Sequence, residues 1–244
     1  DKLDIAFAPG LNIITGETGA GKSILLGALG LILGNRGDVA AIRDAQRNCV
    51  IEAEFDLSGY RLEGLFASFD IDYDQQCMIR RVITPAGKSR AYVNDLPVQL
   101  AALRAIGERL IDIHSQHQTL LLGESRFQTA LLDSVAAHAQ LPTIIFDEID
   151  TGVSGAIADK MGEIITNLSG SLQVVNITHL PQVASKGDHH FLVYKEETPE
   201  GTLSRIRKLS SEARVAEIAK MLSGSAVTAA ATEQARLLLG MEKL

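Results

Sequence analysis

The N-terminal region contains eight consecutive residues with the composition of a phosphate-binding loop. They are Gly16, Glu17, Thr18, Gly19, Ala20, Gly21, Lys22 and Ser23. Glycines allow successive backbone N–H groups to point into one concavity, where they can bind phosphate oxygens. The Lys22 ammonium can reach the β- and γ-phosphates of a nucleotide, and the Ser23 hydroxyl can ligate Mg²⁺. The segment therefore predicts a nucleoside triphosphate site rather than a glycine-rich turn without function.

Two adjacent carboxylates, Asp147 and Glu148, follow an apolar run that begins at Thr143, after Pro142. A strand that is apolar on both faces belongs in the middle of a parallel sheet, and ligands bind at the carboxyl ends of such strands. At that edge Asp147 would hold Mg²⁺ through its water shell, and Glu148 would polarise the attacking water. Taken alone, the pair could equally be a solvated acidic turn, but beside the phosphate loop it predicts nucleotide hydrolysis.

Two further polar residues, Gln116 and His179, follow predicted strands over residues 110–113 and 173–177. In a parallel sheet they would lie at the same edge as Ser23 and Asp147. Gln116 could contact Mg²⁺ or the attacking water, and His179 could hydrogen-bond the γ-phosphate. An ordinary turn residue is the alternative at both positions.

Hydrophobic patterns place these motifs on an α/β framework with a mostly parallel sheet, flanking helices and an additional antiparallel β layer. The strands expected are 11–15, 49–57, 78–84, 89–94, 110–113, 143–147, 173–177, 191–195 and 202–208. The helices expected are 24–33, 98–106, 127–138, 155–168, a segment capped by Ser211, and about 226–239.

Composition limits the class of protein. Hydrophobic residues make up 46% of the 244 residues, and the net charge is −7. The apolar run over residues 24–33 is shorter than the roughly 20 residues of a membrane span, and the chain opens with charged residues, so a cytoplasmic protein is expected. Cys49 and Cys77 are predicted to be buried thiols. Four cations around one hairpin could form a DNA-facing patch or simply solvated strand faces: Arg80, Arg81, Lys88 and Arg90.

Together these motifs resemble the ATPase head of ABC-type proteins, and more closely the SMC-like group with long coiled-coil arms. The strings that carry the resemblance span residues 14–23, 87–94, 112–117, 146–152 and 178–184. The resemblance implies a P-loop fold of the ABC/SMC head type that uses ATP and Mg²⁺. By the same resemblance, Gln116 falls in the Q-loop, Asp150 in the D-loop and His179 in the switch position.

The resemblance also implies organisation and function. Residues 1–140 would form one lobe, with the phosphate loop, the antiparallel layer, the Q-loop and a stub of the coiled-coil helix. Residues 141–244 would form the other lobe, with the acidic pair, the D-loop and the switch histidine. Heads of this group form ATP-sandwiched homodimers that move DNA-tethering arms in double-strand break repair and recombination, which implies DNA as a partner, no membrane, and association with the nucleoid.

Two features of the group are missing from the sequence. The Leu/Ala-Ser-Gly-Gly-Glu signature segment is absent, because Leu141 and Pro142 follow Gln140 directly, and the long arm expected to rise from the 127–138 helix is also absent. A head fragment with weak ATP hydrolysis is therefore expected. The alternatives are the nucleotide-binding subunit of an ABC transporter and a structural DNA tether gated by ATP binding, with incidental hydrolysis.

Overall fold

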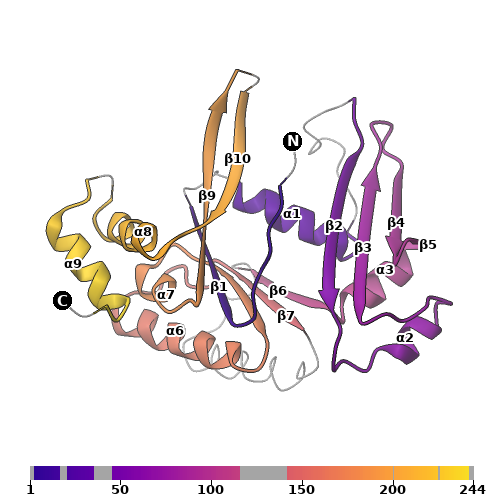
Figure 1. The fold of residues 1–244 in the computed structure, drawn as a ribbon, viewed down its shortest axis with the longest axis horizontal. Coiled ribbons are helices and arrows are strands. Elements are labelled where there is room, and N and C mark those ends of the chain that lie inside the picture. Colours follow the sequence, from indigo (N-terminus) through magenta and orange to yellow (C-terminus); the bar gives the residue numbers. More distant parts are fainter. Residues whose placement is uncertain are drawn as a thin grey trace. The chain divides into compact units, whose positions relative to one another are not determined.

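The computed structural model describes residues 3–16, 21–35, 46–115, 142–199, 201–224 and 226–241. The chain divides into two compact units. One contains the first strand, Lys22 and the described residues from Thr143 onward, and the other runs from Ser23 to Asp112. Figure 1 shows the elements of both units along the chain. No helix among these described ranges is long and apolar enough to cross a membrane.

The first unit is built on a six-stranded sheet with the order β10-β9-β1-β8-β7-β6 (Figure 1). The strands are β1 (Leu11–Gly16), β6 (Ile111–Ser115), β7 (Thr143–Asp147), β8 (Gln173–Ile177), β9 (His189–Thr198) and β10 (Gly201–Lys208). β1 runs parallel to both β8 and β9, and β7 runs parallel to β8. The edge strand β10 runs antiparallel to its neighbour, β9. The predicted mostly parallel sheet is thus confirmed.

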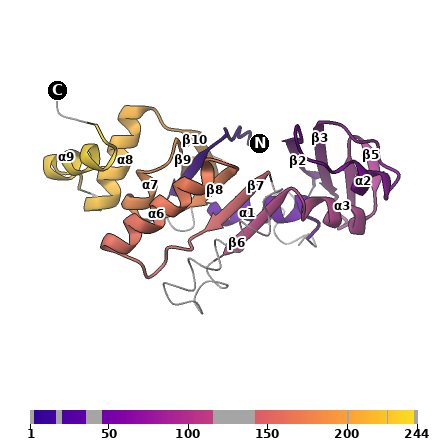
Figure 2. The ribbon, with the colours of Figure 1, turned by 90° about the horizontal axis from the view of Figure 1, so that it is seen from below.

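Of the four described helices of this unit, the first three lie against the sheet and the fourth packs on the third (Figure 2). They are α6 (Gly155–Ser169), α7 (Pro181–Ala184), α8 (Ser211–Ser223) and α9 (Ala229–Leu238). α6 forms because its apolar residues recur at helical spacing, with Ala158, Met161, Ile165 and Leu168 on one buried stripe. That stripe packs on alternate strand residues such as Ile13 and Phe146, both fully buried.

The start of α8 corrects one sequence prediction. Ser210, not Ser211, is the N-cap residue, and its Oγ accepts a hydrogen bond from the backbone N–H of Ala213 at 3.3 Å. The two serines are adjacent, and only the extended backbone of Ser210 (φ −70°, ψ 169°) distinguishes them.

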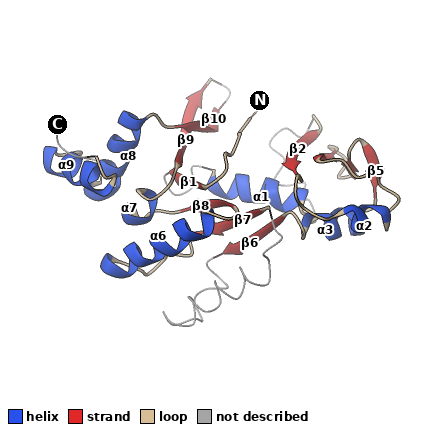
Figure 3. Cartoon of the chain, turned by 60° about the horizontal axis from the view of Figure 1, so that its bottom comes forward, coloured by secondary structure: helices blue, strands red, loops and turns tan. Residues whose placement is uncertain are grey.

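The second unit contains a four-stranded antiparallel sheet with the order β2-β3-β4-β5 (Figure 1), and Figure 3 labels its edge strands β2 and β5. Its strands are β2 (Cys49–Asp56), β3 (Gln76–Ile83), β4 (Ser89–Val93) and β5 (Leu96–Val98), and its helices are α1 (Lys22–Ile32), α2 (Glu63–Ala67) and α3 (Leu100–Gly107). The predicted β3–β4 hairpin is confirmed, with Ile83 opposite Ser89. Val98, predicted to be helical, instead ends β5, and α3 begins at Leu100.

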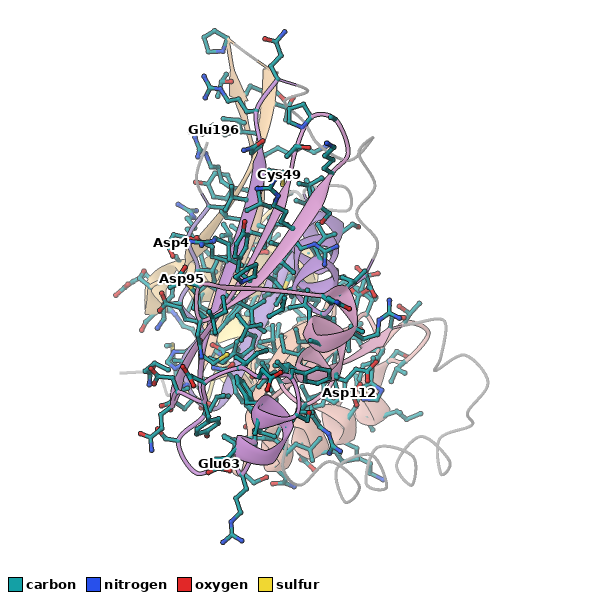
Figure 4. The ribbon with its side chains drawn as sticks, turned by 90° about the vertical axis from the view of Figure 1, so that its right-hand side faces the viewer. Asp4, Cys49, Glu63, Asp95, Asp112 and Glu196 are labelled. Atoms are coloured by element: carbon teal, nitrogen blue, oxygen red, sulfur yellow. The ribbon has the colours of Figure 1, made fainter. Side chains whose placement is uncertain are left out.

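The cations of the β3–β4 hairpin are not a uniform exposed patch. Arg80 pairs at 2.8 Å with Asp95, the residue between β4 and β5 that Figure 4 labels, and lies over the Tyr92 ring. Arg81 is buried and donates from Nε to the Ser89 hydroxyl at 2.6 Å, so the expectation that all four cations face solvent or DNA is wrong for Arg81. Cys77 is buried as expected, and burial raises the pKa of its thiol to about 11.

Candidate functional site

The carboxyl ends of three adjacent parallel strands meet at one edge of the larger sheet. β1 ends at Gly16, β7 ends at Asp147 and β8 ends at Ile177, with Asp147 opposite Ile177 in the register. Each strand end leads directly into one of the motifs found in the sequence. Since ligands of open parallel sheets bind outside these ends, this edge is the candidate site.

Lys22 and Glu148 form an ion pair at this edge. The distance from Lys22 Nζ to Glu148 Oε1 is 2.8 Å, although the residues are 126 positions apart in the sequence. The Lys22 side chain is 10% exposed and the Glu148 side chain 35% exposed. The structure therefore brings the lysine that follows the phosphate loop together with the second carboxylate of the acidic pair.

Glu148 has a left-handed backbone conformation, with φ of +50°. This conformation costs a non-glycine residue on the order of 1 kcal/mol or more and persists only where surrounding bonds impose it. The Glu148 N–H donates to the Ile177 carbonyl at 3.0 Å, and the Glu148 carbonyl accepts from the Thr151 hydroxyl at 2.9 Å. Hydrogen bonds from the N–H and to the carbonyl of Glu148 thus fix the backbone of the residue that carries the carboxylate.

Asp147 lies partly buried next to this pair. Burial, followed by the negative charge of Glu148, raises the pKa of the Asp147 carboxyl, while Lys22 opposes the shift. Two carboxylates with one ammonium leave the site one positive charge short, which suits a divalent cation. Among the described residues no group of three or more His, Cys, Asp or Glu side chains could hold a metal. Mg²⁺ is usually held by one or two carboxylates together with waters and phosphates, and Asp147 and Glu148 supply two carboxylates at this edge.

Asp150 and His179 also lie together, through a residue that the sequence analysis missed. The Thr178 hydroxyl donates to Asp150 Oδ2 and accepts from the Leu180 N–H at 2.9 Å. His179 Nδ1 is 4.0 Å from Asp150 Oδ1. Asp150 is fully buried, and that burial raises the pKa of its carboxyl against the opposing effects of Thr178 and His179. In the sequence, the only sign of this contact is that Thr178, a hydroxyl residue, directly precedes His179 at the end of a predicted strand.

Several predicted site residues lie outside the described part of the chain: Glu17, Thr18, Gly19, Ala20 and Gln116. Ser23 is exposed, in the first turn of α1, and belongs to the second unit. Gly16 is described, and its position requires glycine. A Cβ atom there would lie 2.3 Å from the Val193 carbonyl oxygen of β9, at φ of +151°. The start of the phosphate loop is therefore packed directly against the backbone of β9.

Comparison with known proteins yields a family match and several named relatives. A family model described as the RecF/RecN/SMC N terminal domain matches residues 1–201. The DNA repair protein RecN of Haemophilus influenzae is 39% identical over 144 residues, which cover 57% of this chain and 26% of that protein. RecN of Bacillus subtilis is 41% identical over 138 residues, covering 56% of this chain and 24% of that protein. The chain thus spans about a quarter of the length of these curated relatives.

Among the solved structures with a similar arrangement are SMC heads. An SMC head bound to the C-winged helix domain of ScpA has a TM-score of 0.64 at 15% identity, covering 87% of this chain and 94% of that one. The SMC head domain from Thermotoga maritima has a TM-score of 0.61 at 17% identity, covering 84% and 92%. At this identity the likeness concerns the fold alone, and it confirms the head fold expected from the motifs.

Proposed function

Since the chain belongs to the family of the RecF/RecN/SMC N terminal domain, we propose that it is the ATP-binding and hydrolysing head of an SMC-like protein acting in DNA double-strand break repair and recombination. The observation that carries the proposal is the 2.8 Å ion pair between Lys22 and Glu148. A phosphate-binding lysine and a carboxylate suited to polarising water lie within contact distance at the ligand-binding edge of a parallel sheet.

Different residues at this edge would bind the phosphates and the magnesium ion. The backbone N–H groups of the loop Gly16–Ser23 and the Lys22 ammonium would bind the phosphates of ATP. Ser23 and Asp147, together with Gln116, would hold Mg²⁺, which would neutralise charge on the β- and γ-phosphates. Adenine, rather than another base, is proposed from the family.

The catalytic residues would be Glu148, Gln116 and His179. Nucleotide phosphates attract Lys22 more strongly than a single carboxylate does, so binding would release Glu148 from its 2.8 Å contact with Lys22. The freed carboxylate would orient and polarise the attacking water, with help from Gln116. His179 would donate a hydrogen bond to the γ-phosphate, and its neighbour Asp150 would couple that contact to the loop after Glu148.

In a full-length protein, closure of two such heads around ATP would move arms that tether DNA. Closure must be favoured only when the γ-phosphate is present, since a ligand shifts an equilibrium only by its differential affinity. The named relatives are DNA repair proteins, which supports this function over the transporter subunit considered above. The ATP-gated tether shares the same binding site and differs only in whether hydrolysis is required.

Calorimetric titration of the 244-residue chain with Mg-ATP tests the binding site. We expect Lys22→Ala to abolish the heat of binding, because the residue that bears the phosphate-binding charge is removed. Lys160→Ala, which deletes an equal charge from the exposed surface of α6, should bind as the unaltered chain does. No heat with the unaltered chain, or equal binding by Lys22→Ala, would overturn the proposal.

Glu148→Gln in a full-length protein separates the repair ATPase from the tether. The variant should retain nucleotide and accumulate closed heads, because binding is intact and water activation is lost. Full repair activity by Glu148→Gln would show that hydrolysis is incidental.

A further inference from the structure

A polar network with two buried members and one partly exposed member lies next to the start of the phosphate loop. We call it the Thr15 network, and it consists of Thr15, His190 and Glu217. The Thr15 hydroxyl lies 2.9 Å from His190 Nε2 and donates to Glu217 Oε1 at 3.1 Å. Thr15 and His190 are 1% and 2% exposed. Three elements, β1, β9 and α8, therefore meet at the residue before Gly16.

The hydrogen bonds fix the protonation of His190. The Thr15 hydroxyl has one hydrogen, and since this hydrogen goes to Glu217, His190 Nε2–H must be the donor to Thr15 Oγ1. His190 Nδ1 has no hydrogen-bond partner among the described residues. Burial, with a smaller contribution from the charge of Arg214, lowers the pKa of His190 to about 3. The ring is thus a neutral donor at physiological pH.

Arg214 holds the helix that carries Glu217. It lies three residues earlier on α8, and its Nη2 donates to the carbonyls of Ala184, Ser185 and Gly187. Those carbonyls belong to the end of α7 and the turn that follows, so α8 is anchored to the segment just after His179 and Leu180. Arg214 thus anchors the same helix that presents the Glu217 carboxylate to Thr15.

β9 restrains the next residue as well. His190 bonds the Thr15 side chain, while the Val193 carbonyl occupies the space that a Cβ of Gly16 would need. The side chain of one residue and the backbone of the next are therefore both fixed at the point where β1 becomes the phosphate loop.

We propose that His190 and Glu217 are positioning residues for nucleotide binding, which act through Thr15 to hold the start of the phosphate loop in its binding geometry. The inference rests on the proposed function. A valine at position 15 would fill a similar volume without polar groups to satisfy, so packing alone does not require the network. Fixing Thr15 and Gly16 before the ligand arrives reduces the ordering cost of binding, which is what preorganisation achieves.

The test compares Thr15→Val with Thr15→Ser in calorimetric titrations of the 244-residue chain with Mg-ATP. Thr15→Val removes the hydroxyl and should weaken binding about tenfold, equivalent to about 1.4 kcal/mol. Thr15→Ser keeps the hydroxyl and should bind within about twofold of the unaltered chain. Thr143→Val is the matched control, because the buried Thr143 hydroxyl donates to Gln173 Oε1 at 3.0 Å at the opposite end of the same sheet.

Thermal melting without nucleotide separates positioning from general stability. Thr15→Val and Thr143→Val should both lower the melting temperature, but only Thr15→Val should lose affinity. Equal loss of affinity in both variants, or unchanged affinity in Thr15→Val, would overturn the inference. If Thr15→Val does not fold, Glu217→Ala at a partly exposed position of α8 gives the same comparison, with an expected loss of about threefold and overturning by unchanged affinity. No binding by the unaltered chain would instead overturn the proposed function, and this inference with it.

Discussion

Replacing Glu148 by glutamine should make the chain bind nucleotide more tightly when Mg²⁺ is absent. The substitution keeps the size of the side chain and an oxygen that can accept from Lys22, but it removes the charge from the 2.8 Å ion pair. Because nucleotide phosphates must displace Glu148 from Lys22, the strength of that pair is subtracted from the binding free energy. Weakening the pair should therefore raise the affinity.

The exposure of the two side chains sets the magnitude. Hydrogen bonds to charged groups contribute about 1.5–3 kcal/mol when shielded, whereas exposed ion pairs contribute about 0–1 kcal/mol. Lys22 is nearly buried, at 10% exposed, but Glu148 is 35% exposed, which places the pair near the lower range. We take about 1 kcal/mol, which corresponds to about fivefold in the dissociation constant.

Titration with ADP in the presence of a chelator isolates this competition, because Asp147 and Glu148 then have no cation to attract. Glu163→Gln, at an exposed position of α6, is the control for loss of one negative charge. The reasoning is refuted if Glu148→Gln binds ADP no more tightly than the unaltered chain, or if Glu163→Gln gives the same gain.

Three further predictions concern stability and assembly. Phe146→Ala should lower the free energy of unfolding in urea by about 3–5 kcal/mol, because the ring is fully buried in the core, whereas Ile157→Ala at a 43% exposed position should have little effect. Because the pKa of His190 is lowered in the folded chain, the unfolded chain takes up a proton at a higher pH than the folded chain does. The contribution of His190 to the free energy of unfolding should therefore be complete above pH 6.5 and decline as the pH falls toward 3. His190→Gln should flatten that decline when urea titrations at pH 7 and pH 5 are compared. Without the signature segment, the chain should remain monomeric with Mg-ATP and turn over slowly; a dimer in sedimentation, or rapid cooperative hydrolysis, would contradict this.

Much of the framework could be predicted from local patterns. β2 alternates apolar and acidic residues, β7 contains the apolar run over residues 144–146, and a Pro-Ala-Gly-Lys turn separates β3 from β4, so each pattern lies within its own segment. The strings around the phosphate loop and the acidic pair also indicated the SMC-like group, which the family match confirms.

The missed elements are short. α2 has five residues, α7 has four and β5 has three, so none is long enough to show a hydrophobic period. His114 and Ser115, predicted as loop because they are polar, instead extend β6, since pairing in the sheet decided the backbone there.

The candidate site was predictable in part for a different reason. The ion pair between Lys22 and Glu148 follows from two motifs that each end a strand. The Thr15 network depends instead on β9 lying next to β1, and the sequence of β9 does not indicate that β1 is its neighbour. The contacts of Thr178 with Asp150 and of His190 with Thr15 arise from this strand order. Sequence patterns predict the strands but not their order in the sheet.

That strand order also governs how the chain can be made. β1 is the first strand in the sequence, yet its partners are β8 and β9, which begin at Gln173 and His189. During synthesis the buried strand β1, of which Leu11, Ile13 and Ile14 are apolar, stays unpaired until residues 173–193 have been made. Such long-range parallel pairing is slow to form, and it leaves the apolar residues of β1 uncovered until their partner strands are available.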